Sequence, residues 1–185
     1  HAASEVHGVD AVNLAGGMDA WAETTLAEPL VRRGDLTVIQ YQRPSSGCLA
    51  YLIVAGGDAS ADDGGDAADR EALVVDPLRA FADLYVDDAA ELGATLRYAV
   101  DTHVHADHVS GVRAVSDATG GDAEVVLPAG ATERGLAFDA TLLADGDTLR
   151  VGDVDVSAIH APGHTSELTC LRLHGGDPDA ADVLF

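Results

Sequence analysis

The sequence has 185 residues, 47% of them hydrophobic and only 4% aromatic, and its formal net charge is −22. This length suits one domain of ordinary size, or one domain and a fragment of another. A surface this acidic repels nucleic acid and anionic membranes, so neither is an expected partner. No apolar run approaches the roughly 18 residues needed to span a bilayer. All ten basic residues are arginine, and we interpret the composition as a halophilic adaptation, in which high salt screens the repulsion between like charges.

The two cysteines, Cys48 and Cys170, are too few for a disulfide framework. Each lies in an apolar, strand-like run, so we expect both to be small buried side chains. The sequence starts without methionine and without a signal-peptide pattern, so it looks cut from something longer, and we expect a cytoplasmic protein. Oligomerisation stays open.

The first two dozen residues are expected to form a unit of their own. Residues 4–8 look like the end of a helix, residues 11–14 like a short strand, and a helix begins at Met18 after the turn Gly16-Gly17. We expect a linker over residues 25–34. Residues 1–27 are therefore assigned to the separate unit and the start of this linker, and residues 28–185 to the main domain.

Strands dominate the main domain. Apolar periodicity predicts strands at 36–42, 48–55, 71–76, 96–100, 123–127, 148–151, 154–160, 166–173 and 182–185, with helices at 78–92 and 109–118. Residues 56–70, rich in Gly, Ala and Asp, are expected to form a solvated loop. Because helices do not alternate strictly with strands, the order favours an α+β fold in which two β-sheets pack together with helices outside.

A run of metal-binding residue types follows the strand expected at 96–100. Residues 101–108 read Asp-Thr-His-Val-His-Ala-Asp-His. In extended backbone His103 and His105 point the same way, so both imidazoles can reach one metal ion. The chain then turns into a helix and carries Asp107 and His108 toward a neighbouring position. If buried, each group would need a partner, whereas imidazoles and carboxylates clustered on a loop suit Zn or Fe.

A further histidine lies in the segment Ala-Pro-Gly-His-Thr at residues 161–165. Its Pro-Gly pair predicts a sharp turn that projects His164 from the end of the preceding strand. A catalytic metal needs a third imidazole or carboxylate and an open position for substrate. We therefore expect His103, His105 and His164 as metal ligands and Asp107 and His108 as catalytic groups beside them.

Together, His-x-His-x-Asp-His and the later Pro-Gly-His-Thr turn resemble the metallo-β-lactamase superfamily. The resemblance runs from about residue 36 to the end. It implies a four-layer αββα sandwich with the metal site at one sheet edge, truncated here at the C-terminus.

More narrowly, residues 101–111 are similar to the persulfide dioxygenase branch, as are Asp76-Pro77, Leu92-Gly93 and the segment 161–167. That resemblance implies one Fe(II) bound by two histidines, here His103 and His164, and by one aspartate. It also implies oxidation of a thiol persulfide, such as glutathione persulfide, to sulfite with O₂. His105, Asp107 and His108 would then support the ligands or be remnants of a two-metal site.

The third ligand of that branch is an aspartate in a Thr-Gly-Asp turn after the next strand. The sequence ends at Phe185, apparently inside or just before that strand. We therefore expect this ligand beyond Phe185.

Residues 12–21, Val-Asn-Leu-Ala-Gly-Gly-Met-Asp-Ala-Trp, resemble the closing segment of rhodanese domains. In rhodaneses the sulfur-carrying cysteine lies upstream of this segment. The resemblance implies a rhodanese–persulfide dioxygenase fusion, in which both parts handle sulfane sulfur.

Two alternatives stay open. A glyoxalase II-like thioester hydrolase (hydroxyacylglutathione hydrolase) would use Zn(II), with two ions holding a bridging hydroxide. All four residues His103, His105, Asp107 and His108 would then be ligands. The other alternative is a non-catalytic sulfur-relay or binding module, suggested by the absence of the rhodanese cysteine and of the ligand aspartate. Both enzyme hypotheses predict a small-molecule partner, either a thiol persulfide or a thioester.

Overall fold

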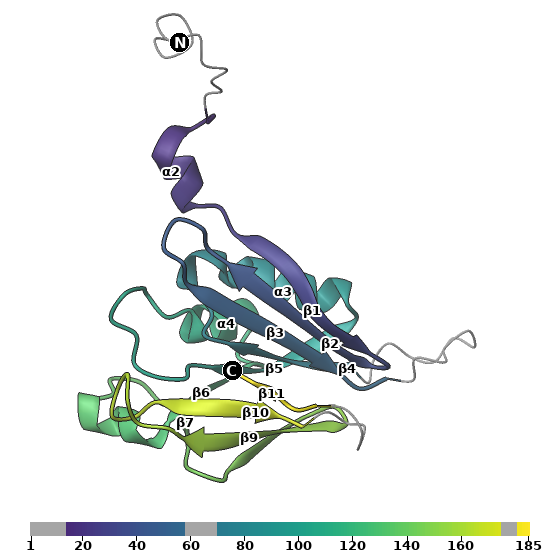
Figure 1. The fold of residues 1–185 in the computed structure, drawn as a ribbon, viewed down its shortest axis with the longest axis vertical. Helices are drawn as coiled ribbons and strands as arrows, with labels where there is room; N and C mark the ends of the chain where they lie inside the picture. The colour runs from purple at the N-terminus through teal and green to yellow at the C-terminus, as the bar shows by residue number, and fades with distance from the viewer. Residues whose placement is uncertain (1–13, 58–69, 175–180) are drawn as a thin grey trace, which may run out of the picture.

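The computed structural model describes residues 14–57, 70–174 and 181–185. Within them two β-sheets pack face to face, and two α-helices lie against the larger sheet (Figure 1). The helix expected at 4–8, and most of the strand at 11–14 and of the loop at 56–70, lie outside the described residues.

The larger sheet has the strand order β1-β2-β3-β4-β5-β6-β7. The pairs β1–β2, β2–β3 and β3–β4 are antiparallel, whereas the pairs β4–β5, β5–β6 and β6–β7 are parallel. Its strands are β1 (Leu26–Arg33), β2 (Leu36–Gln42), β3 (Leu49–Ala55), β4 (Arg70–Val75), β5 (Ala94–Val100), β6 (Glu124–Pro128) and β7 (Thr141–Leu143).

The smaller sheet has the order β11-β10-β9-β8 and is antiparallel throughout. Its strands are β8 (Thr148–Val151), β9 (Val154–His160), β10 (Thr169–Leu173) and β11 (Val183–Leu184). Aliphatic side chains of both sheets, among them Ile53, Val75, Val156 and Leu171, form one buried core between them. Buried and more exposed residues alternate along β9 because one face of this strand packs on the core.

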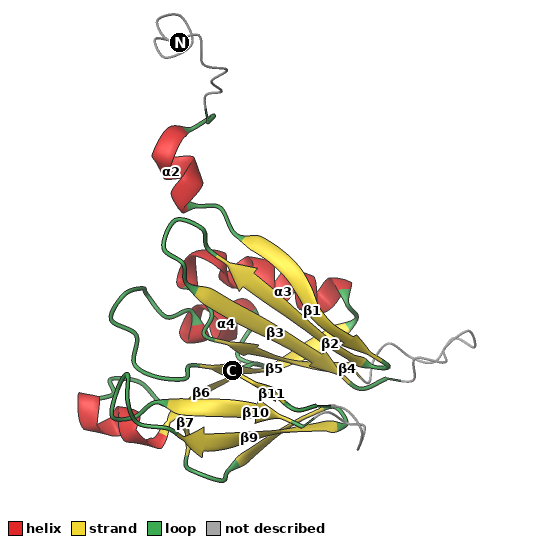
Figure 2. Cartoon of the chain, viewed as in Figure 1, coloured by secondary structure: helices red, strands yellow, loops and turns green. Residues whose placement is uncertain are grey.

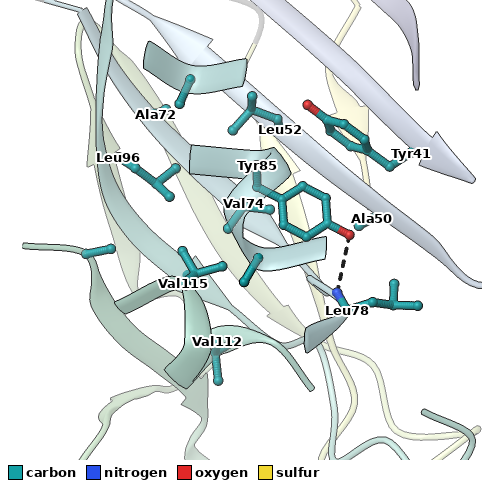
Figure 3. Close-up of a cluster of buried hydrophobic side chains, with 14 of the residues drawn as sticks. Tyr41, Ala50, Leu52, Ala72, Val74, Leu78, Tyr85, Leu96, Val112 and Val115 are labelled. Atoms are coloured by element: carbon teal, nitrogen blue, oxygen red, sulfur yellow. Dashed lines mark hydrogen bonds between the residues drawn. The ribbon is translucent and has the colours of Figure 1, made fainter. Parts of the chain in front are cut away.

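The opposite face of the larger sheet is covered by α3 (Ala82–Glu91) and α4 (Val112–Ala118) (Figure 2). Figure 3 shows the core that they enclose, in which Tyr85 of α3 packs edge-on against Tyr41 with ring centroids 4.9 Å apart. The buried Tyr85 hydroxyl accepts the backbone N–H of Leu78 at 3.3 Å, which satisfies both groups. This hydrogen bond anchors the segment that follows β4 to helix α3.

These layers confirm the expected α+β fold with two packed sheets. The fourth, helical layer of the expected αββα sandwich is not among the described residues, where α3 and α4 both lie on the larger sheet. Two short 3₁₀ helices, η2 (Arg79–Phe81) and η3 (Ala129–Arg134), complete this part of the fold. Within the described part of the chain, no helix is both long and apolar enough to cross a bilayer.

The linker expected at 25–34 is wrong, because β1 occupies most of it and pairs with β2 along its length. Almost all of β1 is exposed, and a register shift between Pro29 and Val31 interrupts the pairing, so no alternating pattern marks this edge strand. The expected domain boundary at residue 27 falls inside β1. The helix expected from Met18 is found as α2 (Gly17–Ala22), none of whose residues is buried.

Smaller differences concern the starts of two helices and one short strand. The helix expected at 78–92 begins with η2, and the one expected at 109–118 begins only at Val112. Strand β7 was not expected, because a strand of three residues gives too short a periodic signal.

Candidate metal centre

The histidine-bearing segments meet at one end of the sandwich. Strands β4 and β5 are parallel, so Asp76 and the run at 101–108 follow them at the same sheet edge. Strand β3 is antiparallel to β4, which places Cys48, just before it, at that edge too. The smaller sheet contributes the loop after β9, and the backbone N–H of Thr169 donates to the carbonyl oxygen of Thr102 at 2.9 Å.

The structure brings the sequence-predicted histidines together. The ring of His164, from the smaller sheet, lies edge-on to that of His103 with centroids 4.9 Å apart. The ring centroid of His105 lies 4.1 Å from that of His103 and 4.0 Å from that of His108. All four rings line one cavity of about 330 Å³, which is also lined by Cys48, Leu49, Tyr51, Asp76 and Asp107.

Hydrogen bonds of His103 and His105 fix which nitrogen of each of these two rings is free to bind a cation. The Thr102 hydroxyl donates to Asp76 Oδ2 at 2.8 Å, so at 2.9 Å it accepts from Nδ1 of His103 and leaves Nε2 without a proton. Nε2 of His105 lies 3.0 Å from Asp76 Oδ1, which leaves Nδ1 of His105 free. A carboxylate that orients an imidazole in this way is typical of metal sites.

Asp76 lines the cavity as well, although the sequence did not predict a role for it. Its carboxylate also accepts the Thr102 backbone N–H at 2.7 Å, and its φ of 49° is left-handed, which is uncommon outside glycine. The ligand atoms of Asp76, His103 and His105 all lie within 4.8 Å of one another. The signal available was the Asp76-Pro77 pair after a buried strand, but residue types alone do not show that this carboxylate turns toward a run 25 residues later.

His108 has an unusual environment. Its side chain is only 5% exposed, yet neither ring nitrogen makes a hydrogen bond, although Nδ1 lies 3.3 Å from Asp107 Oδ1. Buried nitrogens without partners are costly, and a bound cation would satisfy one of them. The exposed Asp107 lies beside Cys48, with Oδ2 3.9 Å from Sγ. Cys48, expected as a small buried side chain, is partly buried against the core and also lines the cavity.

The electrostatics keep two of the rings neutral. Burial, reinforced by the neighbouring His105, lowers the pKa of His103 and of His108, and neutral imidazole is the form that binds a cation. Burial opposes a charge on His105 as well, but the hydrogen bond and negative charge of Asp76 raise its pKa overall. Burial raises the pKa of Asp101 to about 7. This donor set of imidazoles, carboxylates and a thiol suits Zn or Fe.

No family model matches the chain. A probable metallo-hydrolase of Burkholderia pseudomallei is 31% identical over 146 residues, which cover 70% of this chain and 49% of that protein. The human mitochondrial persulfide dioxygenase ETHE1 is 34% identical over 101 residues, covering 55% of this chain and 38% of that protein. A hydroxyacylglutathione hydrolase of Cereibacter sphaeroides is 39% identical over 100 residues, covering 54% and 37%.

Solved structures agree with these relatives. A metallo-β-lactamase from Staphylococcus aureus superposes with a TM-score of 0.61 at 24% identity, covering 78% of this chain and 40% of that one. ETHE1 from Myxococcus xanthus gives a TM-score of 0.53 at 26% identity, covering 80% and 53%. The chain belongs to the metallo-β-lactamase superfamily. It spans about half the length, or less, of the curated relatives described above.

Members of this superfamily are metal-dependent enzymes, and the cluster of histidines at the sheet edge fits a metal site. His160, four residues before His164, does not line the cavity. Its Nε2 instead lies 2.9 Å from the carbonyl oxygen of Ser166, as expected for a histidine of the strand rather than of the metal site.

Proposed function

We propose that the chain carries the histidine site of a non-haem Fe(II) persulfide dioxygenase, which oxidises a thiol persulfide such as glutathione persulfide to sulfite with O₂. The observation that carries the proposal is the 4.9 Å approach of the His103 and His164 rings from two distant loops. The similarity of residues 101–111 to the persulfide dioxygenase branch, and the relatives named ETHE1, favour this branch.

The reaction converts one thiol persulfide, one O₂ and one water into one thiol and sulfurous acid, which ionises to sulfite. The S–S bond breaks, the terminal sulfur is oxidised, O₂ is reduced, and the released thiolate takes up a proton. When bound, Fe(II) supplies open coordination positions for O₂ and the persulfide sulfur.

The chain's own residues would bind the ion, orient its ligands and transfer protons. His103, His105 and His164 would hold the ion, and Asp76 orients His105 through the hydrogen bond at Nε2. We assign proton transfer at the cavity to Asp107 and His108. Among the described residues, Asp76 has a carboxylate oxygen within 4.8 Å of ligand nitrogens of both His103 and His105.

One observation favours a glyoxalase II-like thioester hydrolase as the second candidate. Cys48, Asp107 and His108 have ligand atoms within 4.8 Å of one another, next to the group of Asp76, His103 and His105. Two adjacent groups of donors would suit two Zn(II) ions, which would activate water for attack on a thioester. The hydroxyacylglutathione hydrolase relatives point the same way.

Metal content and oxygen consumption together test the two candidates. The complete protein product of the gene is reconstituted without oxygen, with Fe(II) or with Zn(II), and assayed with glutathione persulfide and with a glutathione thioester. The dioxygenase proposal expects one iron per chain and O₂ uptake equal to sulfite formed. Two zinc ions per chain and thioester hydrolysis without O₂ uptake would overturn it in favour of the hydrolase.

A further inference from the structure

A buried carboxylate lies just outside the histidine cluster. Glu167, three residues after His164, is 2% exposed, and acidic residues are almost never this buried unless they are paired. Its Oε2 accepts from Nη2 of Arg134 at 2.9 Å and from the Ser166 hydroxyl at 3.0 Å. Its Oε1 accepts the backbone N–H of Val104 at 3.3 Å.

The contact with Val104 reaches the other histidine loop. Val104 is the residue between His103 and His105, so a side chain from the His164 loop binds the backbone that carries both of those imidazoles. A second link lies one residue before His103, where the Thr102 carbonyl oxygen accepts the Thr169 N–H at 2.9 Å. The two links bracket His103 from either side.

A third segment holds Glu167 in place. Helix η3 supplies both Arg134 and Gly130, and a Cβ built on Gly130 would lie only 2.8 Å from the Cβ of Glu167. The absence of a side chain at Gly130 therefore lets η3 pack directly on the glutamate. Burial opposes the charge on Glu167, but the hydrogen bonds that its carboxylate accepts, from Arg134 above all and also from Ser166 and the Val104 N–H, together outweigh burial. The pKa of Glu167 therefore falls to about 2, and the carboxylate stays ionised at neutral pH.

We propose that Glu167 is a positioning residue that sets His103 and His105 at the correct distance from His164 by joining the two histidine loops to η3. This inference rests on the proposed metal site and adds to it a residue that does not touch the ion. Because metal affinity depends on how well ligands are oriented before binding, loss of the link should weaken metal binding more than it weakens folding.

The test compares two glutamates that both accept a backbone N–H. Glu71, at the start of β4, accepts from Gly152 at 2.9 Å and pairs with Arg97 at 3.2 Å, at the opposite end of the sandwich. The variants are Glu167→Ala and Glu167→Gln, with Glu71→Ala and Glu71→Gln as matched controls. Co²⁺ is the probe, read by its dissociation constant and its visible absorption bands. In chelator-treated protein, ¹H–¹⁵N shifts report the Val104 amide and the histidine rings.

We expect Glu167→Ala to weaken Co²⁺ binding about tenfold or more and to shift the Val104 amide and the ring resonances. Glu167→Gln should recover most of this loss, because its amide oxygen can still accept from Val104. The Glu71 variants should lower the melting temperature and leave the Co²⁺ dissociation constant within about twofold.

Equal effects of the Glu167 and Glu71 variants on Co²⁺ binding would overturn the proposal. If Glu167→Ala does not fold, Arg134→Gln replaces it. If the chain binds no Co²⁺, unchanged resonances in the variants overturn the proposal and shifted ones support it. Failure of persulfide oxidation alongside an intact Co²⁺ response would reject the proposed function and leave the role of Glu167 standing.

Discussion

At both ends of the sandwich a glutamate accepts a backbone N–H from another segment, but the two ends differ in the buried polar atoms that lack a hydrogen-bond partner. At one end Glu71 accepts the Gly152 N–H, and at the other Glu167 accepts the Val104 N–H. Within the described residues, however, every buried side-chain nitrogen or oxygen without a hydrogen-bond partner belongs to Asp101, His108 or Thr165, all at the histidine end. A fold can satisfy its polar groups fully, so the unsatisfied end indicates where the chain gives up stability for binding.

The largest expected difference between the ends concerns histidines. His103→Ala should weaken metal binding by more than about a hundredfold, because it removes the nitrogen that the Thr102 hydrogen bond leaves free. His174→Ala removes a half-buried histidine at the opposite end, bonded to Ser157 at 2.9 Å, and should leave binding unchanged. Isothermal titration with Zn²⁺ measures both. Similar affinities for the two variants would remove the functional distinction between the ends.

Each end also has a glycine that permits a close backbone approach. A Cβ on Gly152 would lie 2.6 Å from the Ala55 carbonyl oxygen, and its φ is 56°, whereas a Cβ on Gly111 would lie 2.8 Å from the Pro77 carbonyl oxygen. Gly152→Ala should cost about 3 kcal/mol of unfolding free energy and Gly111→Ala about 2 kcal/mol. Urea denaturation measures both. Only Gly111→Ala should also weaken Zn²⁺ binding to the folded fraction, since Gly111 lies three residues after His108.

A third prediction separates orientation from packing. Asp76→Asn keeps the side chain's size and suits the left-handed backbone at this position, so folding should change little. The loss of the charge beside Nε2 of His105 should weaken Zn²⁺ binding about tenfold to a hundredfold. Asp88→Asn is the control, because Asp88 accepts the Tyr41 hydroxyl at 2.6 Å outside the site. It should cost about 1 kcal/mol of stability and leave binding alone.

The sequence predicted the histidine end well because its chemistry is local. The run at 101–108 holds three of the four histidines that line the cavity, and the strand before it places the run at a sheet edge. The meeting of His103 and His164 was therefore expected and is found. Asp76 and Glu167 were not assigned, because each acts through a contact with a segment far along the chain. Strand β1 was missed because an edge strand with both faces largely exposed carries no hydrophobic alternation.

The smallest predicted effect is on acid stability at the histidine end. The pKa of Glu167 is lowered from 4.5 to about 2. A carboxyl whose pKa falls on folding contributes stability that is fully present above its unfolded value and is lost as the pH falls through the folded one.

The unfolding free energies of the wild type and Glu167→Gln should therefore differ by a constant amount above about pH 4.5 and converge toward pH 2. Urea denaturation in chelator removes any contribution from bound metal. Arg134→Gln removes the contact that lowers this pKa most, so the loss should then be smaller and should be complete at a higher pH. Half-molar salt should also weaken the effect, because Arg134 is half-exposed. A constant difference down to pH 2 would mean that Glu167 stabilises this end by packing rather than by charge.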